Sequence, residues 1–217
     1  EIPLGAMRFN SDSNKLEYWM GSAWMQIQTF SPTLNGGARG FILGGYPGYT
    51  DRIERLNIAT AGNGVDFGNL AYSTSLKGNV SDHTRLCTFG DYNAPDTTMV
   101  NSIEFITMSS DGDTVDFGDM SEGRYSAQPV NNSTRGVYMG GTNVYNSISG
   151  TINNIEFITI QSTGNSVDFG DMSTKTSTGQ GFSSPTRGIS AGGTNPSGGG
   201  RQNPIQFITI SSLGNTQ

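Results

Sequence analysis

The hexapeptide Ile-Glu-Phe-Ile-Thr-Met at residues 103–108 decides the fold, because it recurs at a nearly fixed spacing. It returns as Ile-Glu-Phe-Ile-Thr-Ile at 155–160, as Ile-Gln-Phe-Ile-Thr-Ile at 205–210 and, more loosely, as Ile-Glu-Arg-Leu-Asn-Ile at 53–58. Successive copies start 50, 52 and 50 residues apart. A period of this length is typical of repeat architectures, in which each repeat is one small folding unit.

Two further strings keep step with the hexapeptide. An Arg-Gly string that ends in paired glycines precedes it at 39–45, 135–141 and 187–193, with a degraded copy at 85–91. A Val-Asp-Phe-Gly string follows at 65–69, 115–119 and 167–171, always starting 12 residues after the hexapeptide starts. All three strings are short, rich in β-branched and aromatic residues, and bounded by Gly, Asn, Asp or Pro. They therefore predict an all-β chain.

A Gly-Asx pair lies between the last two strings of each repeat, at 62–63, 112–113, 164–165 and 214–215. Such a pair suits a tight turn with positive φ, so we expect the two flanking strands to form tight antiparallel hairpins. Segments before the Arg-Gly strings, such as 125–130, have the length of a fourth strand. Four-stranded units of about 50 residues are typical of the blades of a kelch-like β-propeller.

The order of these strings resembles the kelch-like repeats in structural proteins of tailed bacteriophages, notably those that infect marine bacteria and cyanobacteria. The resemblance covers 31–217, which divides into repeats at about 31–70, 71–120, 121–172 and 173–217. It implies a protein of the virion surface, of tail-fibre or appendage type. Ordinary kelch repeats carry a late tryptophan, whereas Trp19 and Trp24 lie outside the repeats.

Residues 1–30 predict a separate three-stranded β meander, with strands at 5–10, 15–19 and 23–27. A meander this small needs another surface to cover its aromatic side chains. It resembles a segment of phage tail-fibre proteins that lies beside oligomerising or attachment regions. The resemblance implies contacts with other virion proteins or with a second copy of the chain through Arg8, Phe9, Tyr18, Trp19 and Trp24.

The sequence leaves the closure of the propeller open. The meander could pack on the propeller, or the strand at 23–28 could supply the missing last strand of the ring, because open edges promote aggregation. Further blades beyond residue 217 or neighbouring subunits are the competing ways to cover the edge. Because Glu1 rather than Met opens the sequence, we expect a processed chain or part of a longer one.

Composition argues against several classes of partner and chemistry. The net charge is −6 and the arginines are scattered, which excludes the basic footprint of a nucleic-acid-binding protein. The apolar runs are far shorter than a membrane span of about 20 residues. A single histidine, His83, removes most zinc and copper sites and the usual acyl-transfer triad. Cys87 occupies a strand position filled by Val137 and Ile189 in other repeats, which favours a core role.

The repeated charged residues favour structural roles. Asp111, Asp113, Asp116 and Asp119 resemble a calcium loop, but other repeats carry uncharged residues at equivalent places, so we expect a turn without a metal. We expect the aspartates at 66, 116 and 168 to cap backbone N–H groups, and the arginines at 39, 135 and 187 to stack or to pair with a carboxylate. We predict no catalytic residues, no cofactor and no metal.

The loops after the glycine pairs, at 46–52, 92–102, 142–154 and 194–204, vary while the strands stay constant. That contrast is typical of a rigid scaffold that presents adaptable tips. The loop residues able to bind a polar ligand such as a host-surface glycan are Tyr46, Tyr49, Tyr92, Asn143, Tyr145, Asn195 and Arg201. The sequence thus predicts a phage appendage with a possible recognition face; the alternatives are a purely architectural capsid, neck or tail protein and, less favoured, a propeller-type carbohydrate-active enzyme.

Overall fold

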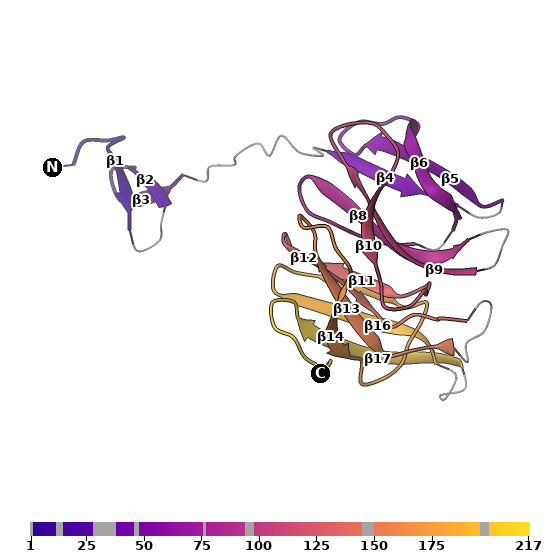
Figure 1. The fold of residues 1–217 in the computed structure, drawn as a ribbon. Coiled ribbons are helices and arrows are strands. Elements are labelled where there is room, and N and C mark those ends of the chain that lie inside the picture. Colours follow the sequence, from indigo (N-terminus) through magenta and orange to yellow (C-terminus); the bar gives the residue numbers. More distant parts are fainter. Residues whose placement is uncertain are drawn as a thin grey trace. The chain divides into compact units, whose positions relative to one another are not determined.

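The structure, a computed structural model, describes residues 2–11, 15–27, 38–45, 48–75, 77–93, 98–144, 150–195 and 200–217. These residues form five small antiparallel sheets (Figure 1), which confirms the all-β prediction. The chain divides into two compact units, Glu1–Leu34 and Asn35–Gln217. Within the described ranges, no helix has the length and apolar character needed to cross a bilayer.

The N-terminal sheet has the order β1 (Met7–Asn10), β2 (Lys15–Trp19), β3 (Trp24–Gln26) and confirms the predicted meander. Cross-strand partners share a face of an antiparallel sheet, and Met7 pairs with Tyr18, which pairs with Met25. One face is therefore apolar. Within this sheet β3 pairs with β2, and the hypothesis that the strand at 23–28 completes the ring stays a prediction.

Four repeat sheets follow, here called the first to fourth repeat sheets. The first contains β4 (Arg39–Leu43), β5 (Thr50–Asn57) and β6 (Val65–Thr74), and the second β7 (Gly78–Ser81), β8 (Arg85–Asn93), β9 (Thr98–Thr107) and β10 (Val115–Asp119). The third contains β11 (Gln128–Asn131), β12 (Arg135–Met139), β13 (Asn154–Thr159) and β14 (Val167–Asp171), and the fourth β15 (Gln180–Ser183), β16 (Arg187–Asn195) and β17 (Gly200–Thr209). The expected strand before the Arg-Gly string is present as β7, β11 and β15. Strand β6 continues past the expected boundary between 70 and 71.

The predicted pairing of the last two strands is confirmed, but the tight turn between them is wrong. Strands β9 and β10 pair antiparallel, yet β9 ends at Thr107 and β10 begins at Val115. The intervening Gly112 donates its N–H to the carbonyl of Phe67 in β6, at 2.7 Å. The Gly-Asx pair is therefore used for contact with the preceding repeat sheet, not for a two-residue turn.

The same contact, here called the Gly-Asx joint, occurs at three successive steps. Asp113 Oδ1 accepts from the N–H of Asn69 at 2.9 Å, and Asn165 Oδ1 accepts from the N–H of Asp119 at 3.0 Å. The third joint consists of Gly214 N–H to Phe169 O at 2.8 Å and Asp171 N–H to Asn215 Oδ1 at 2.9 Å. The repeated Gly-Asx pair therefore gives a repeated contact between each sheet and the sheet before it.

The glycine of each Val-Asp-Phe-Gly string is required by this joint. Gly118 has a φ of 145°, and a Cβ at this position would overlap the backbone of Gly164 in the next repeat. Gly68 and Gly170 have the same conformation and the same kind of neighbour, Gly112 and Gly214. A bulge interrupts the register at this point, as between Asp116 and Gly118.

The core contains the repeated isoleucine and phenylalanine positions. Ile103 is fully buried, and Phe117 from β10 is 3% exposed. Cys87 is fully buried in the same cluster, which confirms its predicted core role, and burial raises the pKa of its thiol to about 12.

Of the repeated arginines at 39, 135 and 187, the last two stack as expected, and so does Arg85 in the degraded string, whereas Arg39 donates to the carbonyl of Met108. Arg85, Arg135 and Arg187 lie 4.4, 4.2 and 4.3 Å above the ring centroids of a phenylalanine on the adjacent strand. Arg135 also donates to the carbonyl of Ile210 in the following repeat, at 2.8 Å.

The capping role expected of the aspartates at 66, 116 and 168 is wrong, because their exposed carboxylates accept no backbone N–H of the described residues. The capping group is the glutamate of the hexapeptide: Glu156 Oε1 accepts from the N–H of Ser121, just beyond β10, at 3.1 Å. These contacts step from each repeat sheet to the next, and none of them joins the fourth sheet back to the first.

Candidate functional site: a polar groove between three repeats

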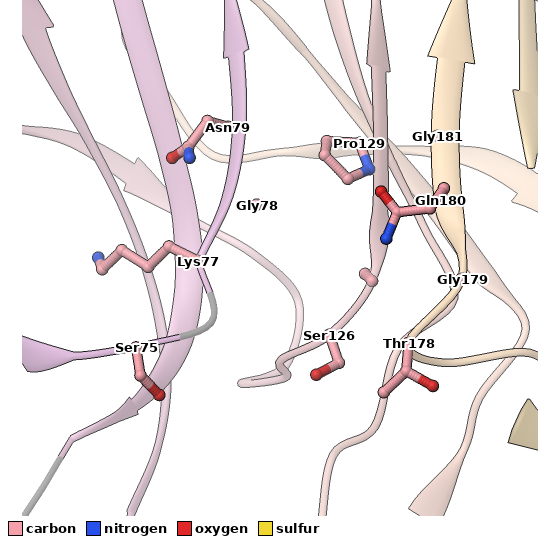
Figure 2. Close-up of a pocket in the computed structure, with 11 residues that line it drawn as sticks. Ser75, Lys77, Gly78, Asn79, Ser126, Pro129, Thr178, Gly179, Gln180 and Gly181 are labelled. Atoms are coloured by element: carbon pink, nitrogen blue, oxygen red, sulfur yellow. The ribbon is translucent and has the colours of Figure 1, made fainter. Parts of the chain in front are cut away.

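A groove of about 490 Å³ lies where the first strands of three repeat sheets begin (Figure 2). Strand β11 contacts both β7 and β15, so equivalent segments of the second, third and fourth repeats meet there. The lining residues are Ser75, Lys77, Gly78, Asn79, Ser126, Ala127, Pro129, Thr178, Gly179, Gln180 and Gly181.

The backbone holds these segments close together. Ser126 and Thr178 both adopt left-handed conformations, with φ of 56° and 59°, and the N–H of Thr178 donates to the carbonyl of Ser126 at 2.8 Å. Small residues permit this approach: a Cβ at Gly179 would lie 2.9 Å from the carbonyl of Ala191. The groove therefore has a wall of backbone and short polar side chains.

The charged groups near the groove are already paired. Lys77 Nζ lies 3.1 Å from Glu104 Oε1 and 2.9 Å from the hydroxyl of Tyr72, and both charged side chains are almost fully buried. In Figure 2 its amine points away from Ser126 and Thr178. Burial lowers the pKa of Lys77, and the charge of Glu104 opposes that shift.

The third repeat has a corresponding buried pair. Arg124 lies 2.7 Å from Glu156, with side chains 0% and 5% exposed. On the second repeat, fully buried Asp91 accepts from the backbone N–H groups of Ser75 and Tyr92, at 3.1 and 2.7 Å. Asp91 thereby fixes the backbone of Ser75, which lines the groove.

The polar groups left at the surface of the groove are neutral. Asn79, Thr178 and Gln180 are exposed, and Ser126 is half-buried. Amides and hydroxyls at fixed positions can donate to and accept from a neutral polyhydroxylated ligand. Chemically, this arrangement can bind and orient such a ligand.

The predicted loop residues are only partly brought together. Tyr49 and Tyr92 are in edge contact, with ring centroids 5.5 Å apart, and Tyr125 extends the row with its centroid 5.7 Å from that of Tyr92. Tyr92 is only 5% exposed, so its expected role as an exposed loop tip is wrong. It packs between repeats because the strands on either side continue into the loop: β8 and β9 pair as far as Asn93 and Thr98.

Three of the other predicted loop residues also lie within the described ranges. Asn143 donates to Glu122 Oε2 at 2.7 Å, which orients its amide. Asn195 is buried, and Arg201 is exposed on β17 opposite Thr194. Tyr46 and Tyr145 lie outside the described residues.

Two of the predicted loops nevertheless begin beside the groove, because Thr142 bridges to Tyr125 and Thr194 bridges to Ser177. Gln128 at the start of β11 pairs with Met139 at the end of β12, and the loop at 142–154 follows β12 directly. Sequence reasoning missed the groove residues because the segments before the Arg-Gly strings, such as 125–130, were expected to form strands and were given no role in binding. One signal was present: a small hydroxyl residue, Ser126 or Thr178, lies nine positions before the arginine of an Arg-Gly string.

The five predicted attachment residues divide between the two faces of the N-terminal sheet. Arg8 lies 2.8 Å from Glu17 and 4.2 Å above the ring of Trp24, which is 5.4 Å from Trp19. The hydrogen bond from Arg8 holds the pKa of Glu17 below its usual range. Phe9 and Tyr18 lie on the opposite, apolar face.

The acidic run at 111–119 does not converge on one point. Asp111 pairs with Arg55 at 3.1 Å, while Asp113 belongs to a Gly-Asx joint. Across the described ranges no group of three or more His, Cys, Asp and Glu side chains is placed to hold a metal ion.

No protein-family model matches the chain, and a search of curated proteins gave no significant match.

Proposed function

We propose that this chain is a non-enzymatic structural and recognition protein of a tailed-phage appendage, of tail-fibre type. In this proposal the repeat sheets are blades of a kelch-like propeller. The groove and the loops at the same end bind a host-surface glycan, and the N-terminal sheet attaches the chain to another virion protein or to a second copy of itself.

The observation that carries the recognition role is a contrast within the repeats. The Gly-Asx joints are the same at three successive steps, whereas the groove positions differ: Asn79 in one repeat, Pro129 in the next and Gly181 in the third line the same groove. A constant scaffold with a varied lining is what selection for a ligand produces on a repeat protein.

The chemistry of the lining favours glycan binding over glycan cleavage. Its exposed polar groups are amides and hydroxyls, and none of the described lining residues is a carboxylate or a histidine. Glycoside hydrolysis ordinarily uses two carboxyl groups placed on either side of the scissile bond. The groove fits a role in binding alone.

The N-terminal sheet supports the attachment role. Met7, Phe9 and Met25 are 61%, 64% and 41% exposed, and together with Tyr18 they form one continuous apolar face. Exposed apolar surface of this kind marks a site of protein association.

An array of bacterial surface polysaccharides tests the recognition role. We expect the chain to retain at least one polysaccharide, and the double variant Asn79→Ala with Gln180→Ala to lose that signal. The matched control Asn63→Ala changes an exposed asparagine on the first repeat and should bind as the parent chain does.

Immunogold labelling of phage particles tests the location. Labelled appendages with polysaccharide binding support the whole proposal. Labelled particles without any polysaccharide binding reduce the role to architecture, and unlabelled particles overturn the virion assignment.

A further inference from the structure

One position of the Arg-Gly string breaks the repeat. The string ends in two glycines in the third and fourth repeats, the second of them at Gly141 and Gly193, whereas the second repeat has Asp91 in that place. All three residues adopt positive φ, with values of 101° and 114° for the glycines and 137° for Asp91. Glycine adopts such a conformation without strain and other residues do not. Asp91 therefore holds a strained backbone where the third and fourth repeats hold none.

In the third and fourth repeats, a backbone bridge follows this glycine. Tyr125 and Thr142 exchange two hydrogen bonds, of 3.0 Å from the N–H of Tyr125 and 2.9 Å from the N–H of Thr142. Ser177 and Thr194 form the same bridge, with distances of 3.1 and 2.8 Å. A Cβ at Gly141 would lie 2.8 Å from the carbonyl oxygen of Tyr125, so the close approach requires the glycine. Each bridge closes a loop onto a segment that lines the groove.

The second repeat has a carboxylate in place of this bridge. The equivalent residues are Ser75 and Tyr92, and both of their N–H groups donate to Asp91, at 3.1 Å to Oδ2 and 2.7 Å to Oδ1. The hydroxyl of Thr74 also donates to Oδ2. A side chain that accepts from both N–H groups occupies the space between the two segments. The backbone bridge of the other two repeats therefore cannot form here.

Asp91 is a costly residue for this position. It is 0% exposed, and a buried carboxylate loses its hydration. Lys77 is close enough for the charges of Glu104 and Asp91 to oppose the lowering of its pKa by burial. The second repeat thus keeps a buried charge and a strained backbone where glycine is sufficient in the third and fourth repeats. Strain that a fold retains in this way is typical of functional positions.

We propose that Asp91 is a positioning residue of the groove: its carboxylate separates the segment at Ser75 from the loop at Tyr92 and so opens the second-repeat wall of the groove to a glycan. This inference rests on the proposed recognition role. Ser75 lines the groove (Figure 2), and Tyr92 packs between Tyr49 and Tyr125. Asp91 therefore fixes one residue of the groove and one residue of the neighbouring tyrosine row, while its own buried side chain contacts no ligand.

The variant Asp91→Gly restores the sequence of the third and fourth repeats and tests the structural step. We expect its crystal structure to show two backbone hydrogen bonds between Ser75 and Tyr92, with the segment at Ser75 moved toward the loop. We expect thermal unfolding at the temperature of the parent chain or higher, because the strained φ and the buried charge are both removed. If Ser75 stayed in place, or if the variant unfolded at a lower temperature, Asp91 would serve stability and the proposal would be overturned.

Binding of a bacterial polysaccharide tests the positioning role. The probe is the array polysaccharide that the parent chain retains most strongly, titrated into each variant by isothermal calorimetry. We expect Asp91→Gly to bind it at least about 10-fold more weakly, because the hydrogen-bonding groups of one wall are displaced. Asp91→Asn tolerates positive φ but offers one acceptor oxygen to two N–H groups, so we expect a smaller loss.

The matched control is Asp168→Gly, which makes the same change at an exposed aspartate of β14 outside the groove lining. This variant should bind as the parent chain does. Equal binding by the parent and Asp91→Gly would overturn the positioning role and leave the proposed glycan binding intact. A parent chain that retains no polysaccharide would overturn the proposed recognition role, and the role of Asp91 with it.

Discussion

The N-terminal sheet and the third repeat sheet are both antiparallel and both consist of strands of three to six residues, yet only one of them buries its apolar side chains. In the third sheet Val137, Met139 and Ile155 are fully buried. In the N-terminal sheet Met7 and Phe9 are more than 60% exposed.

The difference lies in the neighbours rather than in the strands. The third sheet is joined to the second through Asn165 and to the fourth through Asn215, so side chains of adjacent repeats cover it. A three-stranded sheet by itself has little to bury. Burial of apolar side chains in this chain therefore depends on contact between adjacent repeats. We predict that a substitution that disrupts a joint lowers the free energy of unfolding by more than a substitution within the N-terminal sheet.

The largest effect is expected from Gly118→Ala, which puts a Cβ into the joint between the second and third sheets. The positive φ and the overlap with Gly164 act together, so we expect a loss of about 3 kcal/mol or more in the free energy of unfolding, measured by far-UV circular dichroism. Gly62→Ala is the control, since Gly62 has open space around it and should change stability by less than about 0.5 kcal/mol. Equal effects of the two changes would contradict the role of the joint.

The buried pair of Arg124 and Glu156 gives the next effect. Glu156→Ala leaves the guanidinium of Arg124 buried without its charged partner but still in contact with the carbonyls of Asn154 and Tyr138, and we expect a loss of about 3 kcal/mol in chemical denaturation. Glu156→Gln should cost less, because Gln206 holds the equivalent position in the fourth repeat and accepts from the N–H of Thr174 at 3.0 Å. Equal losses for the two variants would show that the charge is essential and the hydrogen bond is not.

A smaller effect is expected when only the side-chain hydrogen bond of a joint is removed. Asn165→Ala removes the acceptor for the N–H of Asp119, and we expect a loss of about 1 kcal/mol. Asn63→Ala changes the same residue type on the first repeat and should leave the free energy of unfolding unchanged. Both variants are measured by thermal unfolding. A cost at Asn63 equal to that at Asn165 would contradict the docking role.

The smallest effect is a pH dependence confined to the N-terminal sheet. Because the pKa of Glu17 is lowered below its ordinary value of 4.5 in the folded chain, the unfolded chain binds more protons there. Stability from the pair with Arg8 is therefore present above pH 4.5 and is lost as the pH falls through the folded value.

Tryptophan fluorescence reports this change selectively, since both tryptophans, Trp19 and Trp24, lie in the N-terminal sheet. We expect the emission to change on acidification below pH 4.5 in the parent chain and to change much less in Glu17→Gln. A circular dichroism signal of the repeat sheets that follows the same curve would contradict the independence of the two units.

The repeated strings predicted most of the local structure. Recurring short strings rich in β-branched and aromatic residues identified the strands, and the substitution of Val137 and Ile189 for Cys87 identified a core position. Local sequence is sufficient for such features because they depend on what a side chain does on its own strand.

The candidate site could be predicted only in part. Thr142 and Thr194, where two of the predicted loops begin, bridge to Tyr125 and Ser177 beside the groove, but the groove itself combines Asn79, Ser126 and Gln180 from three repeats. Their proximity depends on how successive sheets dock, and no local pattern encodes that distance.

By itself the sequence determined the period, the all-β class and the separate N-terminal meander. Only the tertiary structure decided that Gly112 and its equivalents join sheets instead of forming tight turns, and that Glu156 rather than Asp168 caps the neighbouring strand. The physical reason is that strand formation depends on neighbouring residues along the chain, whereas capping, docking and burial depend on groups about 50 residues away that only folding brings into contact.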